Sequence, residues 1–274
     1  MKKSGQVATR NYKSLLIQCV TLFVGVLLPS LVNAEAPAWK GAVPLEKGGM
    51  IRFVSIHSGS FMMGAKNGCY DGLPVHKVDV EDPFWIARTE ITQRQYEKLM
   101  HKNPSSSKKP LQPVENVSWY DAMNFCKKLT EQEREANRIP EGFIFTLPSE
   151  AQWEYACRAG TTGAFAGDLD RLGWYGANSG GLVQMVGRKQ PNAWGLYDMH
   201  GNVWEWCLDD WHPKYCGAPV DGSAWGWGRT PERPIRGGAW YLEAIKCRSA
   251  SRFHRRPEEH SRSIGFRPVL TKDR

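Results

Sequence analysis

Residues 195–206 read Gly-Leu-Tyr-Asp-Met-His-Gly-Asn-Val-Trp-Glu-Trp, and we call them the signature segment. Its aromatic residues are typical of a protein core. Its hard oxygen donors indicate a second interpretation, because Asp198 and Glu205 each supply a carboxylate. A turn at Gly201 would let backbone carbonyls converge between them, which is how proteins hold Ca²⁺. The segment alone leaves both interpretations open.

The composition is that of a globular protein. The chain has 274 residues, of which 41% are hydrophobic and 23% charged. The formal net charge is +8, and residues 1–34 contain four basic and no acidic side chains, which leaves 8 − 4 = +4 for the remainder. This remainder is only mildly basic and its charges alternate in sign, so we expect no nucleic-acid partner.

Residues 1–34 have the pattern of a signal peptide. Basic residues precede an apolar run over Leu15–Leu28, and the small-residue pattern Val32-Asn33-Ala34 follows it. Cleavage before Glu35 predicts an exported protein, periplasmic or secreted, with no stable membrane span afterwards. An uncleaved anchor is the less favoured alternative, because the run is interrupted and shorter than the roughly 20 residues that span a bilayer.

The remainder is predicted to form a short extension, residues 35–49, and one irregular α+β domain, residues 50–270. Residues 50–63 favour two short strands around a turn, and residues 75–80 favour a third. Capping boxes predict helices beginning after Thr92, Ser118 and Ser149, the last ending at Gly160. Beyond residue 160 the sequence is rich in Gly, Trp and Asn without helical periodicity, which predicts turns and short strands.

The signature segment occurs with six further blocks in a fixed order. They are Gly-Ser-Phe-Met-Met-Gly at 59–64, Pro-Val-Glu-Asn-Val-Ser-Trp-Tyr-Asp-Ala at 113–122, Leu-Pro-Ser-Glu-Ala-Gln-Trp-Glu-Tyr-Ala-Cys-Arg-Ala-Gly at 147–160, Arg-Gly-Gly-Ala-Trp at 236–240, Cys-Arg-Ser-Ala-Ser-Arg at 247–252 and Gly-Phe-Arg-Pro at 265–268. This series, from about residue 50 to 270, resembles the formylglycine-generating enzyme family, also called sulfatase-modifying factors. The resemblance implies one domain of the C-type lectin-like type with little regular secondary structure.

The resemblance also implies a structural Ca²⁺ in the signature segment. The family's ligands, two side chains and two backbone carbonyls, fall on Asp198, Gly201, Val203 and Glu205. A second family Ca²⁺ site would begin at Asn178. The acidic insertion that completes it is missing here, so that site is not expected.

The family's copper site is not expected either. The family binds copper through two cysteines after its Arg-Gly-Gly-Ser block and uses O₂ to oxidise a substrate cysteine. The serine is Ala239 here, and the following residues carry no cysteine; the positions concerned are Ala239, Trp240, Tyr241, Leu242 and Ile245. Thiolates select Cu(I), so the resemblance predicts that the family's oxidase chemistry is lost.

Six cysteines follow the signal peptide, and an even number in an exported chain favours disulfides. The resemblance implies a Cys157–Cys247 disulfide, whereas the family's partner for Cys126 is replaced by Pro268. Cys126 is then either free and buried or differently paired. The remaining cysteines, Cys69, Cys207 and Cys216, are interpreted as loop staples. A free thiol beside Asp209, Asp210 and His212 that forms a redox or metal site is the alternative.

Arginine and histidine residues are concentrated between residues 248 and 267. One interpretation is a solvated face with a few buried arginines. The other is a positive rim around a substrate groove that favours an acidic peptide or a small anion. The candidate groove residues are Trp204, Trp240, Tyr241, Arg248 and Arg252.

Two functions follow from these observations. The first is an exported maturation or modifying factor that acts on a protein or a peptide-derived substrate without the copper site. The second is a non-catalytic, lectin-like module that binds a partner enzyme.

Overall fold

A computed structural model describes residues 39–45, 49–66, 72–226 and 230–273. The predicted signal peptide, its cleavage site and Cys69 lie outside these residues. Among the residues that are described, no helix is both long enough and apolar enough to cross a membrane.

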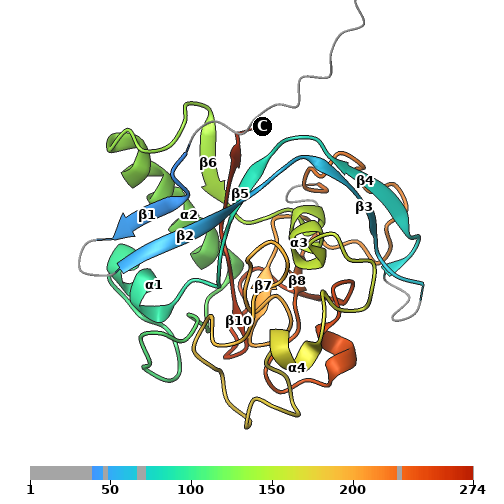
Figure 1. Cartoon of the computed structure of the whole chain (residues 1–274). Coiled ribbons are helices and arrows are strands. Elements are labelled where there is room, and N and C mark those ends of the chain that lie inside the picture. The colour runs from blue at the N-terminus through green and yellow to red at the C-terminus, as the bar shows by residue number, and fades with distance from the viewer. Residues whose placement is uncertain (1–38, 46–48, 67–71, 227–229, 274) are drawn as a thin grey trace, which may run out of the picture. The chain divides into compact units, whose positions relative to one another are not determined.

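The chain forms a mixed helix and sheet domain, as predicted (Figure 1). The helices are α1 (Gln93–Met100), α2 (Trp119–Glu135), α3 (Glu150–Arg158), α4 (Leu169–Leu172) and the 3₁₀ helix η2 (Ala244–Cys247). The strands are β1 (Ala42–Leu45), β2 (Gly49–Ile56), β3 (Gly59–Met63), β4 (His76–Val80), β5 (Phe84–Ala87), β6 (Phe143–Thr146), β7 (Trp204–Trp206), β8 (Arg233–Arg236), β9 (Arg252–Arg255), β10 (Ile264–Gly265) and β11 (Val269–Lys272).

The three predicted helix starts are confirmed. Thr92, Ser118 and Ser149 are the N-caps of α1, α2 and α3, and each forms a complete capping box with the residue three positions later. These reciprocal hydrogen bonds satisfy backbone N–H groups that the first helical turn cannot pair. Helix α3 ends slightly earlier than predicted, because Ala159 already adopts the left-handed conformation with φ 46°.

The strands predicted in residues 50–63 are present, but they do not pair with each other. Strand β2 lies between β1 and β5 in a five-stranded sheet of order β1-β2-β5-β11-β6, while β3 pairs only with β4. Strand β1 falls within the predicted extension 35–49 and pairs with β2 from Ala42 to Leu45. That extension is therefore partly built into the sheet.

Strand β5 divides the interior into two hydrophobic clusters. Successive side chains of a strand point to opposite faces. Trp85 and Ala87 accordingly pack with α1 and α2 residues, whereas Phe84 and Ile86 pack with α3 and the β3–β4 hairpin. Figure 1 shows the same arrangement, with α1 and α2 beside the large sheet and α3 below the β3–β4 hairpin.

A second sheet gathers the later sequence blocks around the signature segment. Its order is β10-β7-β8-β9, and β7 is the end of the signature segment. Glu205 lies opposite Arg236 of β8, which in turn lies opposite Arg252 of β9. Three blocks that are far apart in sequence therefore meet on one small sheet.

Candidate functional site

The signature segment bends sharply before it enters β7. Asp198 and Asn202 both have φ of 57°, and Gly201 has φ of 92°. A Cβ at Gly201 would overlap the carbonyl oxygen of Trp174, which pairs with Gly201 in an isolated bridge. Only glycine fits this close backbone approach, so the turn predicted at Gly201 is confirmed.

Two buried carboxylates lie behind this turn. Asp198 Oδ2 accepts a hydrogen bond from the Gly187 amide at 2.7 Å, and Glu90 Oε1 accepts one from Asn202 Nδ2 at 3.0 Å. The second oxygens, Asp198 Oδ1 and Glu90 Oε2, are buried without a partner on any other described residue. A hydrogen bond between the two carboxyl groups, which needs one of them to be protonated, lowers the pKa of Asp198. An unpaired buried carboxylate oxygen is costly unless a cation or a proton reaches it.

The pKa values of both carboxyl groups are raised. Burial is the largest cause for each, and the charge of Asp198 further raises the pKa of Glu90. The Gly187 hydrogen bond and Arg267 partly offset burial at Asp198, whose pKa is nevertheless raised to about 6.

Glu205 is held differently from Asp198. Arg267 donates to both of its oxygens at 2.6 Å, and the Trp153 indole donates to Oε2 at 2.7 Å. When they are ionised, Glu90, Asp198 and Glu205 carry three negative charges against the single positive charge of Arg267.

The unpaired oxygens would fit a calcium ion, and the calcium site implied by the resemblance stays a prediction. No group of three or more His, Cys, Asp or Glu side chains is arranged to hold a metal within the part of the chain that the structure describes. An ion beside Asp198 would therefore rely on backbone carbonyls, as the resemblance implies for Gly201 and Val203. The bonds from Arg267 place Glu205 as a supporting residue. Glu90, which sequence analysis missed, is the second buried carboxylate beside this turn, and the four predicted calcium ligands stay a prediction.

The segment between Trp240 and Cys247 is anchored to the signature segment and to the loop before it. The Trp240 amide donates to the Asn202 carbonyl at 2.8 Å, and Ser179 Oγ donates to the Trp240 carbonyl at 2.7 Å. Ala239 is buried, Trp240 and Leu242 are half-buried, and Tyr241 and Ile245 are exposed. The Trp240 indole N–H is buried without an acceptor, as is that of Trp174.

The five cysteines in the described residues are all free thiols. Cys126 is buried and free, which is one of the two predicted alternatives. Cys207 and Cys216 do not form a staple with each other. Burial raises the pKa of Cys126 and Cys207 well above the ordinary thiol value, and raises that of Cys157 to about 12.

The implied Cys157–Cys247 disulfide is not formed in the structure. His200 lies between the two residues: its Nδ1 donates to the Cys247 carbonyl at 2.8 Å, and Cys157 Sγ lies 3.8 Å from its Nε2. The Ala166 amide donates to Nε2 at 3.1 Å. These bonds require the neutral ring, and burial lowers the pKa of His200 to about 4.

The alternative redox or metal site near Cys207 does not assemble. Asp209 accepts from the backbone amides of Glu150 and Trp225, and Asp210 is paired with Arg233. Their carboxylates therefore satisfy backbone and arginine donors.

The groove that was predicted from the arginines is not present in the structure. Trp204, Arg248 and Arg252 are 6%, 7% and 5% exposed, so they form no open rim. Arg252 pairs with Glu150 at 2.6 Å, and Arg236 bridges Glu150 and Glu154 at 2.7 Å each. Burial alone would raise the pKa of Glu150, but the two arginines lower it to about 2. Sequence analysis missed this ion-pair network, although Glu150 and Glu154 are four residues apart on α3.

A family model described as "Sulfatase-modifying factor enzyme 1-like domain" matches residues 42–272. The chain belongs to this family. The solved structure of PvdO from Pseudomonas aeruginosa shares 31% identity and superposes with a TM-score of 0.73, covering 85% of this chain and 98% of that one. Treponema denticola variable protein 1 superposes with a TM-score of 0.74 at 28% identity, with the same coverage. The predicted α+β domain of the formylglycine-generating enzyme type is confirmed.

Two curated relatives match parts of the chain. Chaperone protein LppX of Paenibacillus barcinonensis is 31% identical over 176 residues, which cover 47% of this chain and 62% of that protein. The formylglycine-generating enzyme of Streptomyces coelicolor is 32% identical over 179 residues, 58% of this chain and 52% of that enzyme. The chain thus spans less than two thirds of these relatives.

Proposed function

We propose that this sulfatase-modifying factor relative is an exported maturation factor that acts on a protein or peptide-derived substrate without thiolate-copper chemistry. The observation that carries the proposal is the segment from Ala239 to Lys246, which contains no cysteine. The thiol that follows it, Cys247, has its pKa raised to about 12 by burial, so it is protonated at neutral pH.

The argument against copper is chemical. Cu(I) selects soft thiolate ligands, and a metal-binding cysteine must lose its proton. Tyr241, Leu242 and Glu243 offer no comparable donor. The buried thiols described above all lie in surroundings that favour the protonated form.

The surface at Trp240 supports binding of an extended peptide. The backbone of Asn202 links Trp174 to Trp240. Its amide donates to the Trp174 carbonyl, and its carbonyl accepts from the Trp240 amide, each at 2.8 Å. The exposed ring of Tyr241, 5.2 Å from the Trp240 ring, adds apolar contact area.

The test uses the mature protein loaded with Cu(I) and a peptide containing the Cys-x-Pro-x-Arg sulfatase motif. Mass spectrometry is expected to show unmodified cysteine, while the Streptomyces coelicolor enzyme, as the positive control, forms the aldehyde. Aldehyde formation by this protein at a comparable rate would refute the proposal.

The second candidate function is a non-catalytic accessory module. The similarity to a protein named as a chaperone favours it, because a folding partner needs a binding surface and no oxidase. Incubation with the protein encoded beside its gene separates the two functions. A covalent mass change in that protein supports a modifying factor, and a stable complex of unchanged masses supports an accessory module.

A further inference from the structure

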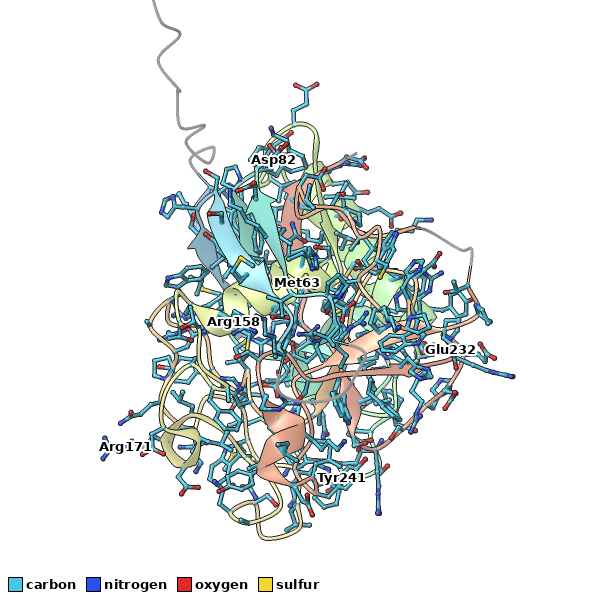
Figure 2. The ribbon with its side chains drawn as sticks, turned by 90° about the vertical axis from the view of Figure 1, so that its right-hand side faces the viewer. Met63, Asp82, Arg158, Arg171, Glu232 and Tyr241 are labelled. Carbon is cyan, nitrogen blue, oxygen red and sulfur yellow. The ribbon has the colours of Figure 1, made fainter. Side chains whose placement is uncertain are left out.

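A cavity of about 790 Å³ lies between the β3–β4 hairpin, the C-terminal end of α3 and η2. Figure 2 shows part of this region, where Arg158 lies below Met63 at the end of β3. We call it the basic cavity, because its described lining contains four cationic and no acidic side chains: Lys66, Lys77, Arg158 and Arg248. Its volume suits a small organic ligand.

Arg158 is the buried cation of this cavity, at 5% exposure. Its guanidinium has five N–H groups. Nε and Nη2 donate to Glu154, Nη2 also donates to the Gly64 carbonyl, and Nη1 donates to the Gly163 carbonyl. Four N–H groups are thus used within the described residues, which leaves one on Nη1 for a ligand in the cavity.

Arg158 shares its carboxylate partner, Glu154, with the guanidinium of Arg236. The buried network contains three guanidinium groups, those of Arg158, Arg236 and Arg252, against the two carboxylates of Glu150 and Glu154. Tyr215, which also contacts the network, stays neutral because burial raises its pKa well above the ordinary value. Asp209 lies at the opposite end of α3, at the Glu150 amide. Of these three guanidinium groups, that of Arg158 lines the cavity.

The other walls of the cavity are largely apolar. Phe61 and Tyr155 pack with ring centroids 5.3 Å apart, and Met62 and Ile245 are about half exposed at its edge. Lys66 and Lys77 are exposed, and Lys77 forms only a surface pair with Asp79.

We propose that the basic cavity binds an amphiphilic anion, with a phosphate, sulfonate or carboxylate group at Arg158 and the lysines and an apolar body against Phe61 and Tyr155. A second cavity, of about 610 Å³, provides an internal comparison. It is also mainly apolar, but its lining carries four acidic and three basic side chains: Asp82, Glu131, Asp221, Asp273, Lys127, Arg134 and Lys272. Charge therefore directs an anion to the basic cavity.

The experiment titrates the fluorescent probe 8-anilinonaphthalene-1-sulfonate into three forms of the mature protein. The first is wild type, the second is Lys66→Glu/Lys77→Glu, and the third is the matched control Lys40→Glu/Lys98→Glu, which makes the same change in net charge at positions that line neither cavity. All four lysines are exposed, so folding is preserved. We expect the second form to bind the probe about ten-fold more weakly and the control to change less than two-fold.

Competition identifies the ligand chemistry. Monomeric octyl phosphate is expected to displace the probe from wild type, and octanol at equal concentration is not. Equal weakening in both double variants, or equal displacement by octanol, would overturn the proposal. Phosphatidylglycerol vesicles distinguish a free anion from an anionic lipid surface. If the protein sediments with the vesicles and octyl phosphate does not displace the probe, the protein binds a lipid surface, and the proposed binding in the cavity is refuted.

Discussion

The pair formed by Arg267 and Glu205 predicts a large loss of stability in Arg267→Met. The change removes the guanidinium that donates to both Glu205 oxygens at 2.6 Å and to the Tyr197 carbonyl at 2.9 Å. A buried carboxylate that loses its partner costs about 3–5 kcal/mol, and an unsatisfied buried carbonyl about 1 kcal/mol more. The expected total of about 4–6 kcal/mol is a large part of the roughly 5–15 kcal/mol by which domains are stable.

The measurement is the free energy of unfolding from urea denaturation at pH 7. The control is Arg134→Met, which removes a surface arginine lying 3.9 Å from Asp273, with both side chains more than half exposed. We expect that control to lose less than about 1 kcal/mol. In Arg267→Met/Glu205→Gln the uncompensated charge is gone, so part of the stability returns. A loss below about 1 kcal/mol in Arg267→Met alone would contradict the role of this pair.

Three further predictions concern the signature segment. A calcium chelator is expected to lower the melting temperature of wild type but not of Asp198→Asn. This effect of the chelator should fade as the pH drops below about 6, where Asp198 takes up a proton. An unchanged wild-type melting temperature would count against the ion. His200 is neutral when folded, with a pKa of about 4, but protonates near 6.5 when unfolded, so stability falls as the pH drops from about 6.5 to about 4. Urea curves should show a loss of stability over this range that is about 3 kcal/mol larger in wild type than in His200→Asn, and equal losses would refute it. Gly201→Ala should lose more than 2 kcal/mol because its Cβ overlaps the Trp174 carbonyl, whereas Gly217→Ala, with φ 83° and open space, should lose only about 1 kcal/mol; similar losses would contradict the close approach.

Local signals predicted the helices because each signal is complete within four residues. Thr92, Ser118 and Ser149 carry the whole capping box in their own sequence, and the hydrogen bonds form as expected. Strand pairing has no such local signal. Strands β2 and β3 are separated by two residues, yet β2 pairs with β1 and β5, because the two clusters on either side of β5 decide the partners.

The site was predictable only where its residues lie in the signature segment. Asp198 and Gly201 are in that segment, but Glu90 reaches it from 112 residues before Asn202. The arginine groove failed for a related reason. Sequence shows the density of arginines but not the carboxylates Glu150 and Glu154, which come from another part of the chain and draw Arg236 and Arg252 inside.

The segment from Trp240 to Cys247 is fixed at both ends to the signature segment. Its first end is the Trp240 amide on the Asn202 carbonyl, and its other end is the Cys247 carbonyl on His200. Asn202 and His200, which hold the two ends, are only two residues apart. The six residues between Trp240 and Cys247 must therefore fold back, and they do so through η2. Only Tyr241 and Ile245 project from it as exposed large apolar side chains. Substitutions at these two positions should therefore alter what the protein binds while leaving its stability within about 0.5 kcal/mol, the usual limit for surface changes.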